Sequence, residues 1–377
     1  MTPKITVLGA GFAGMEFCTQ ISEAFGDQVQ VTLIDASDSF VFGYSKLDVM
    51  FGLTPPETVY LPYSQFIKPG VRLLRERVTS IDPVTRRVST DHGHHDADYL
   101  VIALGAIYDI DATPGLAEET EFYSVDGAKR LRDVLPSFRQ GHALVGVCGA
   151  PYKCPPAPSE CALMLHDYLT KAGVRKDCEI SLVLPLSSPV PPSPETSAAL
   201  LEAFAERGIR FIPNRRIASV DAATGIATLD DGSTLAYDLF LGVPKHSAPP
   251  VVKAAGLTEN GWVTVNPRTL ETPFPGVYAV GDIANTGTPK AGVFAEGAAG
   301  AVASAVIARI RGSDDASLYA GAGVCYLEFG GGRIGRVAVD FFSGPKPTGT
   351  YQAPSQAMRE DKQRFGSTRK VRWFAMQ

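Results

Sequence analysis

The sequence contains no C-x-x-C pair, although it has 6 cysteines in 377 residues. They lie at positions 18, 148, 154, 161, 178 and 325, a spacing that fits neither a zinc site nor the disulfide framework of a small secreted domain. The histidines at positions 92, 94 and 95 fit a solvated hairpin loop better than a metal tract. No metal site is expected, and a disulfide in a reducing compartment would be catalytic.

Long apolar runs and blocks of like charge are also missing. The most apolar stretches, residues 99–108 and 297–308, are shorter than the roughly 18 residues of a spanning helix, which excludes a membrane span and leaves only peripheral contact. The net charge is −5 and no basic block is present, so nucleic acid is not an expected partner. The N-terminus enters a strand-like segment without a signal peptide, which predicts a cytoplasmic protein.

What remains is the composition of an ordinary folded protein. Hydrophobic residues make up 45% of the chain and charged residues 20%, far from the disordered class. At about 150 residues per domain, the length predicts two or three domains with a sizeable core.

The first segment predicts a strand, a glycine turn, a helix and a second strand. Residues 5–8 form an apolar run, residues 13–25 have helical spacing, and residues 29–35 alternate as in a strand. The turn is Gly9-Ala10-Gly11-Phe12-Ala13-Gly14, and Asp35 follows about 20 residues later. Motif, context and acid together indicate a dinucleotide-binding βαβ unit.

Each glycine of this turn has its own expected role. Gly9 permits the tight turn, Gly11 lets the backbone approach a pyrophosphate, and Gly14 lets the helix pack close to the strand. The N–H groups at the helix N-terminus would face the phosphates, and Asp35 would hydrogen-bond the adenosine ribose. A glycine turn that binds nothing is the alternative, but it would not explain the acid at that distance.

Two later segments indicate which dinucleotide is bound. Residues 98–106 are a buried strand ending in a turn of small residues, and residues 276–282 are a strand ending in Gly-Asp. Both resemble signatures of the two-dinucleotide-binding-domain flavoproteins, in which this acid holds the ribityl and phosphate region of the flavin. The resemblance implies FAD, bound through Gly9, Gly11, Gly14, Asp35, Ala103, Gly105, Gly281 and Asp282.

The resemblance also implies the fold, an α/β protein with two Rossmann-like βαβ domains. The FAD-binding domain is expected to be split into residues 1–107 and 261–320. A second dinucleotide-fold domain spans residues 108–260, and residues 321–377 form a small C-terminal segment.

The second domain lacks an intact NADH fingerprint. Its first strand, residues 143–147, leads into a loop that contains Pro151, Pro155 and Pro156. These prolines remove N–H donors that a pyrophosphate would need. The strand of residues 180–184, which should end in an acid for the ribose, ends in proline. NADH binding is therefore disfavoured, unlike in type II NADH dehydrogenases and ferredoxin reductases, which share the fold.

The loop in its place resembles a redox-cysteine motif of the sulfide:quinone oxidoreductases and the flavocytochrome c sulfide dehydrogenase flavoproteins. Lys153-Cys154-Pro155-Pro156 is similar to their first cysteine segment, and Gly323-Val324-Cys325-Tyr326 to their second. Residues 241–246, 289–296 and 365–374 also resemble stretches of that family. The resemblance implies that Cys154 and Cys325 form a redox pair over the flavin. No third cysteine lies between Cys18 and Cys148, which argues against long polysulfide growth.

In that chemistry, hydrosulfide attacks a disulfide sulfur and leaves a persulfide on one cysteine and a thiolate on the other. The thiolate then passes two electrons to the flavin. The resemblance makes Cys325 the partner of the flavin, while the order of action and the sulfur product stay open. Lys153 is expected to favour the Cys154 thiolate electrostatically. The remaining cysteines are expected to be small buried hydrophobes.

Further candidates have structural alternatives. Glu160, near the start of the helix after Cys154, suits either the helix dipole or a proton transfer. His246 is expected either to line the cysteine pocket or to be a surface turn residue. Lys290 and the helix beginning near Gly292 are expected at the pyrimidine edge of the flavin, where positive potential stabilises the reduced ring.

The electron acceptor depends on the chain after Pro345. We expect one short helix at residues 355–365, with the aromatic side chains of Trp373 and Phe374 either at a lipid interface or folded back over the second face of the flavin. The basic residues suit weak, salt-sensitive attachment to anionic lipid on the inner membrane face, with quinone as acceptor. The basic residues are Arg359, Lys362, Arg364, Arg369, Lys370 and Arg372.

The leading interpretation is an FAD-dependent enzyme that oxidises sulfide or a related sulfur species. The alternatives are an NAD(P)H-dependent flavoprotein reductase of the type II NADH dehydrogenase kind and a non-catalytic flavin-binding electron carrier with structural cysteines. A cytochrome is the alternative acceptor, and a homodimer stays open.

Overall fold

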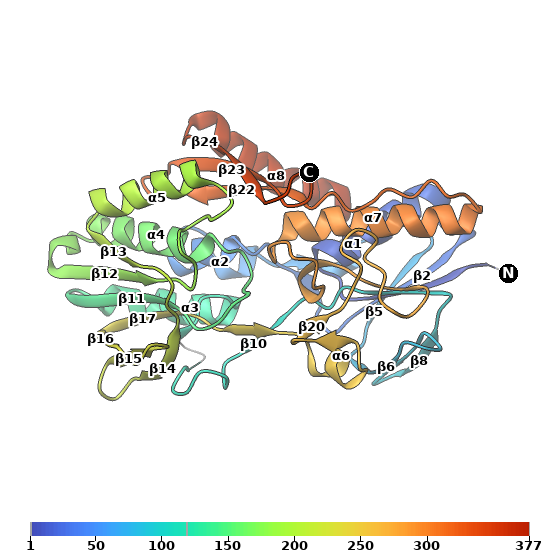
Figure 1. Cartoon of the computed structure of the whole chain (residues 1–377), viewed down its shortest axis with the longest axis horizontal. Coiled ribbons are helices and arrows are strands. Elements are labelled where there is room, and N and C mark those ends of the chain that lie inside the picture. Colours follow the sequence, from blue (N-terminus) through green and yellow to red (C-terminus); the bar gives the residue numbers. More distant parts are fainter. Residues whose placement is uncertain (1, 118–119, 377) are drawn as a thin grey trace.

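In the computed structural model, which describes residues 2–117 and 120–376, two lobes lie side by side (Figure 1). Each lobe is built on a parallel sheet with helices packed on it. Between the lobes, β10 (Ile107–Asp109) pairs antiparallel with β18 (Lys245–Ser247). This arrangement confirms the predicted α/β fold with two Rossmann-like βαβ units.

The first lobe contains a five-stranded sheet in the order β21-β9-β1-β2-β5. The central strand β1 (Lys4–Leu8) is buried from Ile5 onward, as expected for a strand covered on both faces. The edge strand β21 comes from late in the sequence and pairs parallel with β9, so distant segments share one sheet. The other strands are β2 (Gln30–Asp35), β5 (Val71–Arg75), β9 (Tyr99–Ile102) and β21 (Val277–Ala279).

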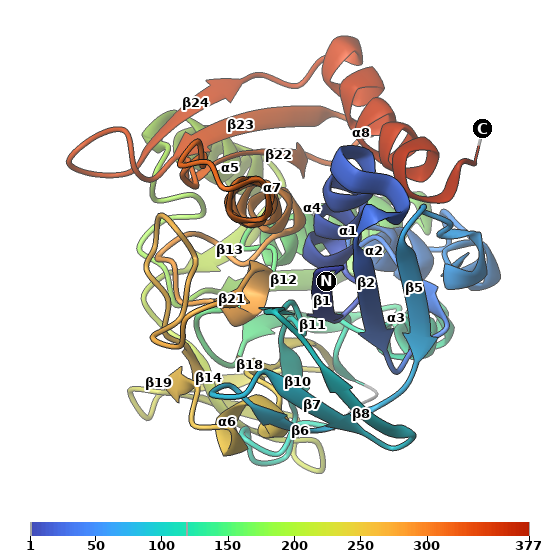
Figure 2. The same ribbon diagram turned by 90° about the vertical axis from the view of Figure 1, so that its right-hand side faces the viewer.

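Helices α1 (Phe12–Phe25) and α7 (Gly292–Arg311) pack against each other on this sheet (Figures 1 and 2). The lengths of the apolar runs in the sequence excluded a membrane span. Within the described residues, however, α7 is the one helix that is long and apolar enough to cross a membrane by length and composition. Half of its apolar window is buried inside the protein. A core helix passes the same test, and α7 forms part of the core of the first lobe.

The second lobe contains a parallel sheet in the order β13-β12-β11-β17. Its strands are β11 (Gly141–Val147), β12 (Cys178–Val183), β13 (Ile209–Ile212) and β17 (Leu239–Val243). The helices are α3 (Val125–Val134), α4 (Ala157–Lys171) and α5 (Pro194–Glu206). A separate antiparallel sheet comprises β14 (Ile217–Asp221), β15 (Ile226–Leu229) and β16 (Thr234–Ala236).

The C-terminal segment forms an antiparallel sheet followed by α8 (Gln356–Phe374), which lies beside α1 (Figure 2). The expected helix at residues 355–365 is therefore too short. The last turns of α8 are held by Trp373, which is only 1% exposed and packs on the first lobe, a long-range contact that local sequence does not reveal. The strands are β22 (Ala322–Glu328), β23 (Ile334–Asp340) and β24 (Thr348–Gln352).

The smaller elements connect these layers. The hairpin sheet of the first lobe consists of β6 (Val78–Asp82), β7 (Arg87–Thr90) and β8 (Gly93–Asp96). The others are α2 (Ser45–Met50), α6 (Pro250–Ala254), β3 (Ser39–Phe40), β4 (Leu61–Pro62), β19 (Thr258–Glu259) and β20 (Trp262–Val263).

Candidate functional site

A cavity of about 650 Å³ lies where the carboxyl ends of the first sheet meet the second lobe and the C-terminal segment. In open parallel sheets this is where ligands bind, because the strand order reverses there. The volume falls within the roughly 300–1,000 Å³ of small-molecule sites. The predicted site residues that border it are Gly9, Gly11, Asp35, Ala103, Gly105, Lys153, Cys154, Glu160, Gly281, Asp282, Lys290, Gly292 and Cys325.

The glycine turn separates structural from ligand-facing positions. Gly9 has a φ of 98°, and a Cβ there would lie 2.4 Å from the carbonyl oxygen of Ala103. A Cβ on Gly14 would lie 1.9 Å from the carbonyl oxygen of Gly9, so Gly14 sets the helix–strand packing without bordering the cavity. A Cβ on Gly11 would meet no protein atom within 4 Å. The fold itself therefore does not require glycine at position 11, which leaves space for a ligand.

Two helix N-termini meet this cavity without protein partners for their charge. Neither α1 nor α7 has a side-chain cap or an acidic residue in its first turn, and Gly11 and Gly292 border the cavity. Free N–H groups at a helix N-terminus are suited to bind phosphate. Asp35 is fixed at the end of β2 by hydrogen bonds from the N–H groups of Ala10 (2.7 Å) and Ser37 (2.8 Å).

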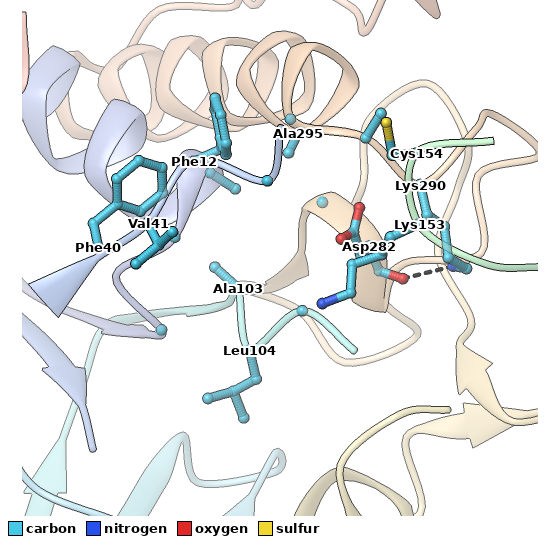
Figure 3. Close-up of a pocket in the computed structure, with 18 of the residues that line it drawn as sticks. Phe12, Phe40, Val41, Ala103, Leu104, Lys153, Cys154, Asp282, Lys290 and Ala295 are labelled. Atoms are coloured by element: carbon cyan, nitrogen blue, oxygen red, sulfur yellow. Dashed lines mark hydrogen bonds between the residues drawn. The ribbon is translucent and has the colours of Figure 1, made fainter. Parts of the chain in front are cut away.

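Positive charge gathers around Asp282 on the side of the cavity toward the second lobe (Figure 3). Lys290 Nζ donates to the carbonyl oxygen of Asp282 at 2.5 Å, and burial lowers the pKa of Lys290 to about 8. Burial raises the pKa of the Asp282 carboxyl, although Lys153, Lys290 and Lys46 oppose that shift. Lys153 Nζ donates to the Ala106 carbonyl oxygen at 3.1 Å. This wall can therefore stabilise an anionic ring.

The structure brings Cys154 and Cys325 to the same cavity, both as free thiols. Cys154 has a φ of 48°, which is uncommon outside glycine and costs energy that functional sites often carry. Its N–H donates to the Lys290 carbonyl oxygen at 2.7 Å. Burial raises the pKa of Cys325 to about 12, and nearby Glu160 adds to the shift.

The expectation that Lys153 favours the Cys154 thiolate is wrong. Burial, with smaller contributions from Glu160 and Cys325, raises the pKa of Cys154. The Lys153 ammonium instead lies 4.5 Å from the centre of the Tyr108 ring. Lys153 and Cys154 are neighbours in the sequence, but the ammonium is used by Ala106 and Tyr108.

Glu160 lies in the first turn of α4 and is buried beside the thiols. Its Oε1 accepts a hydrogen bond from the N–H of Glu328 at 3.0 Å. Burial raises the pKa of Glu160 to about 7, while Lys362 opposes the shift and Glu328 and Asp48 add to it. Sequence reasoning missed Asp48 and Glu328, and it placed Lys362 among lipid-facing basic residues. No local pattern announces this cluster, because its members come from separate elements.

The two expectations for His246 are both unsupported by its position. It is 4% exposed, does not border the cavity, and packs edge-on against Tyr108 and Tyr123 with ring centres 5.0 and 5.3 Å away. Its Nδ1 lies 2.8 Å from the Pro244 carbonyl oxygen, and its Nε2 has no partner. Burial, reinforced by nearby lysines, lowers the pKa of His246 to about 3.

The structure also shows the contacts of His95 and of Trp373 near the C-terminus. His95 pairs with Glu76 at 2.8 Å, and the described residues contain no group of three or more His, Cys, Asp or Glu side chains placed so that they could hold a metal ion. Trp373 packs on Phe12 with ring centres 5.4 Å apart and donates to Glu16 at 3.0 Å. Trp373 is therefore folded back, as one alternative proposed, although it covers α1 rather than the cavity.

Comparison with known proteins agrees with this geometry. A model of the pyridine nucleotide-disulphide oxidoreductases matches residues 3–308. The mitochondrial sulfide:quinone oxidoreductase of Mus musculus is 25% identical over 362 residues, 92% of this chain and 80% of that protein. The type II NADH:quinone oxidoreductase of Staphylococcus haemolyticus is 30% identical over 128 residues, 33% of this chain and 29% of that protein. The structure of the Aquifex aeolicus sulfide:quinone oxidoreductase has a TM-score of 0.87 at 23% identity and covers 98% of this chain and 92% of its own.

Proposed function

The chain belongs to the pyridine nucleotide-disulphide oxidoreductase family, a flavin-dependent family, and on that premise we propose that it oxidises sulfide through Cys154 and Cys325 with quinone as acceptor. The observation that carries the proposal is one cavity bordered both by the glycine turn with Asp35 and by the two thiols. Similarity to a sulfide:quinone oxidoreductase over 92% of the chain supports it. A related small sulfur species is included in the proposed substrate class.

FAD is the cofactor in this proposal. The open space at Gly11 and Gly105, where a Cβ would meet nothing within 4 Å, and the uncapped helix N-termini fit its pyrophosphate. Asp35 would bind the adenosine ribose, and Asp282 the ribityl region. Lys290 and the α7 N-terminus would border the pyrimidine edge. When bound, FAD would supply two-electron transfer between the thiols and the acceptor.

The cysteines would perform the sulfur chemistry from their disulfide state. A hydrosulfide sulfur forms a bond to one cysteine sulfur, the disulfide bond breaks, and the second cysteine leaves as a thiolate with the bonding electron pair. Glu160, with a pKa of about 7 and next to both thiols, can accept the persulfide proton near neutral pH.

The acceptor would lie in the same cavity, beside Tyr326, Phe365 and Lys362. Tyr326 and Phe365 border it with ring centres 6.0 Å apart, and Lys362 adds a buried ammonium. Apolar ring surfaces beside a cationic donor suit a quinone, whose oxygens become negative on reduction.

An anaerobic absorbance titration of the purified yellow protein tests the proposal. Bleaching by sulfide is the expected result, while bleaching by NADH alone contradicts it and favours a type II NADH dehydrogenase. The loop with Pro151, Pro155 and Pro156 and the similarity over only 33% of the chain argue against that second reading. No bleaching by either would favour a non-catalytic electron carrier.

A further inference from the structure

Four charged side chains from four separate elements meet beside the thiols. They are Asp48 on α2, Glu160 on α4, Glu328 on β22 and Lys362 on α8. The side chains of Lys362 and Glu328 form an ion pair and are only 15% and 16% exposed. Glu328 also donates its N–H to Glu160. Three carboxyl groups therefore share one ammonium group away from bulk water.

Such a cluster cannot keep every member charged. Burying ions is costly unless they are paired, and one ammonium leaves two carboxylates uncompensated. Burial raises the pKa of Asp48, and the carboxyl groups raise the pKa of Lys362 despite its burial. Burial with too little positive charge therefore favours a protonated carboxyl group in this cluster, and it raises the pKa of Glu160 to about 7.

Two members of the cluster, Glu160 and Lys362, border the cavity. Glu160 acts on the pKa of both Cys154 and Cys325. Lys362 borders the cavity with Tyr326 and Phe365. Glu160 and Lys362 both act on the thiol of Cys154, and Glu328 joins these two side chains through its backbone N–H and its carboxylate.

We propose that Asp48, Glu160, Glu328 and Lys362 form one proton store beside the thiols, in which the charges of the other three side chains set the protonation of Glu160. The use made of this proton rests on the proposed function. Persulfide S–H would give its proton to Glu160 while the electron pair stays on sulfur. Reduction of quinone takes two electrons and two protons, one derived from hydrosulfide and one from solvent through the store. Asp48 and Glu328 are positioning residues, because they act through Glu160 and Lys362.

The test is the pH dependence of thiol alkylation in the purified, reduced holoprotein. Iodoacetamide reacts with the thiolate, and peptide mass spectrometry reads Cys154 and Cys325 separately. Ionisation of Glu160 opposes thiolate formation, so the rise of rate with pH should flatten near pH 7 in the wild type. Glu160→Gln should remove that inflection and increase the alkylation rate several-fold above it.

Charge changes elsewhere in the cluster should move the inflection in opposite directions. Glu328→Gln and Asp48→Asn each remove a negative charge and should shift it down by roughly one pH unit. Lys362→Met should shift it upward. Glu360→Gln, which changes an exposed carboxylate on the same α8 helix, should leave it in place.

The proposal is overturned if the wild type shows no inflection, or if Asp48→Asn and Glu328→Gln keep it at the wild-type pH with normal flavin content and Tm. Should Glu328→Gln fail to fold, the opposite shifts of Asp48→Asn and Lys362→Met decide the question. The assay contains neither sulfide nor acceptor. A failure of the proton-store proposal is therefore distinguishable from a failure of the proposed function, which the titration with sulfide tests.

Discussion

The two lobes use the same strand–turn–helix unit for opposite purposes. In the first, β1 ends at Leu8 and α1 begins at Phe12, so a short glycine turn places an uncapped helix N-terminus at the cavity. In the second, β11 ends at Val147 and α4 begins at Ala157, with Glu160 in its first turn. An acid at this position satisfies the positive end of the helix and disfavours a phosphate.

The longer loop of the second lobe extends as far as the first lobe. Its backbone runs alongside the first lobe, where Lys153 forms a parallel bridge with Lys290 and the Cys154 N–H donates to Lys290. A tight phosphate-binding turn would end within its own lobe. The comparison shows that the longer loop brings Cys154 to the cavity of the first lobe.

The largest expected effect tests whether the loop of the second lobe supplies a reactive thiol. Cys154→Ser should lower the rate of flavin reduction by sulfide by about 10³-fold or more, because serine cannot form the disulfide that is attacked. Anaerobic stopped-flow absorbance measures the rate. Cys148→Ala is the matched control, since Cys148 lies at the start of the same loop but does not border the cavity. A Cys154→Ser rate within tenfold of the wild type would contradict the assignment.

The second prediction tests whether the glycine turn of the first lobe binds the flavin cofactor. Gly11→Val should weaken flavin binding by at least about tenfold, or about 1.4 kcal/mol, because its side chain enters space that no protein atom occupies. The measurement is the flavin-to-protein absorbance ratio after purification. Gly149→Ala, at the equivalent turn of the second lobe, brings its Cβ to 2.9 Å from the flexible Lys245 side chain and should keep the flavin. A fully yellow Gly11→Val protein would show that Gly11 does not face the cofactor.

The same contrast explains what the sequence could predict. The glycine turn, Asp35 and the Gly281-Asp282 strand end are local patterns, so their convergence followed from the βαβ topology. The Glu328–Lys362 ion pair, the charge of Asp48 that acts on it and the burial of Trp373 join elements far apart in the sequence. A basic residue on a weakly apolar helix reads as exposed unless the packing of that helix is known, and this is why Lys362 was misplaced.

The third prediction concerns His246, at the joint between the lobes. The pKa of its buried imidazole is about 3 in the folded protein, against about 6.5 when unfolded. The unfolded chain therefore binds an extra proton between these values, and stability falls as the pH drops below about 6.5. When the pH falls from about 6.5 to about 5, protonation of this histidine in the unfolded chain should lower the free energy of unfolding by about 2 kcal/mol. His246→Phe should not show this loss.

Urea unfolding at both pH values measures this difference. His94→Phe, at an exposed position on β8, should retain the wild-type slope. Parallel curves for His246→Phe and the wild type would mean that the buried imidazole does not titrate as described. Sulfide-dependent flavin reduction should change little in His246→Phe, because this side chain does not border the cavity.

The smallest expected effect concerns α8, which touches both sides of the comparison through Lys362 near the thiols and Trp373 on α1. Several of its basic residues form ion pairs within the protein, since Arg369 pairs with Glu296 at 2.5 Å and Arg372 pairs with Glu16 at 2.8 Å. The exposed cations that remain on the helix include Arg364 and Lys370.

Each such cation should contribute about 1 kcal/mol to binding an anionic lipid surface. Sedimentation with phosphatidylserine vesicles should therefore show weak binding at low salt that disappears at physiological salt, where charges are screened beyond about 8 Å. Arg364→Gln combined with Lys370→Gln should abolish it, whereas Lys253→Gln on α6, at the opposite side of the molecule (Figure 1), should not. Absence of binding at any salt concentration would favour a soluble acceptor or a cytochrome, because a membrane quinone requires contact with lipid.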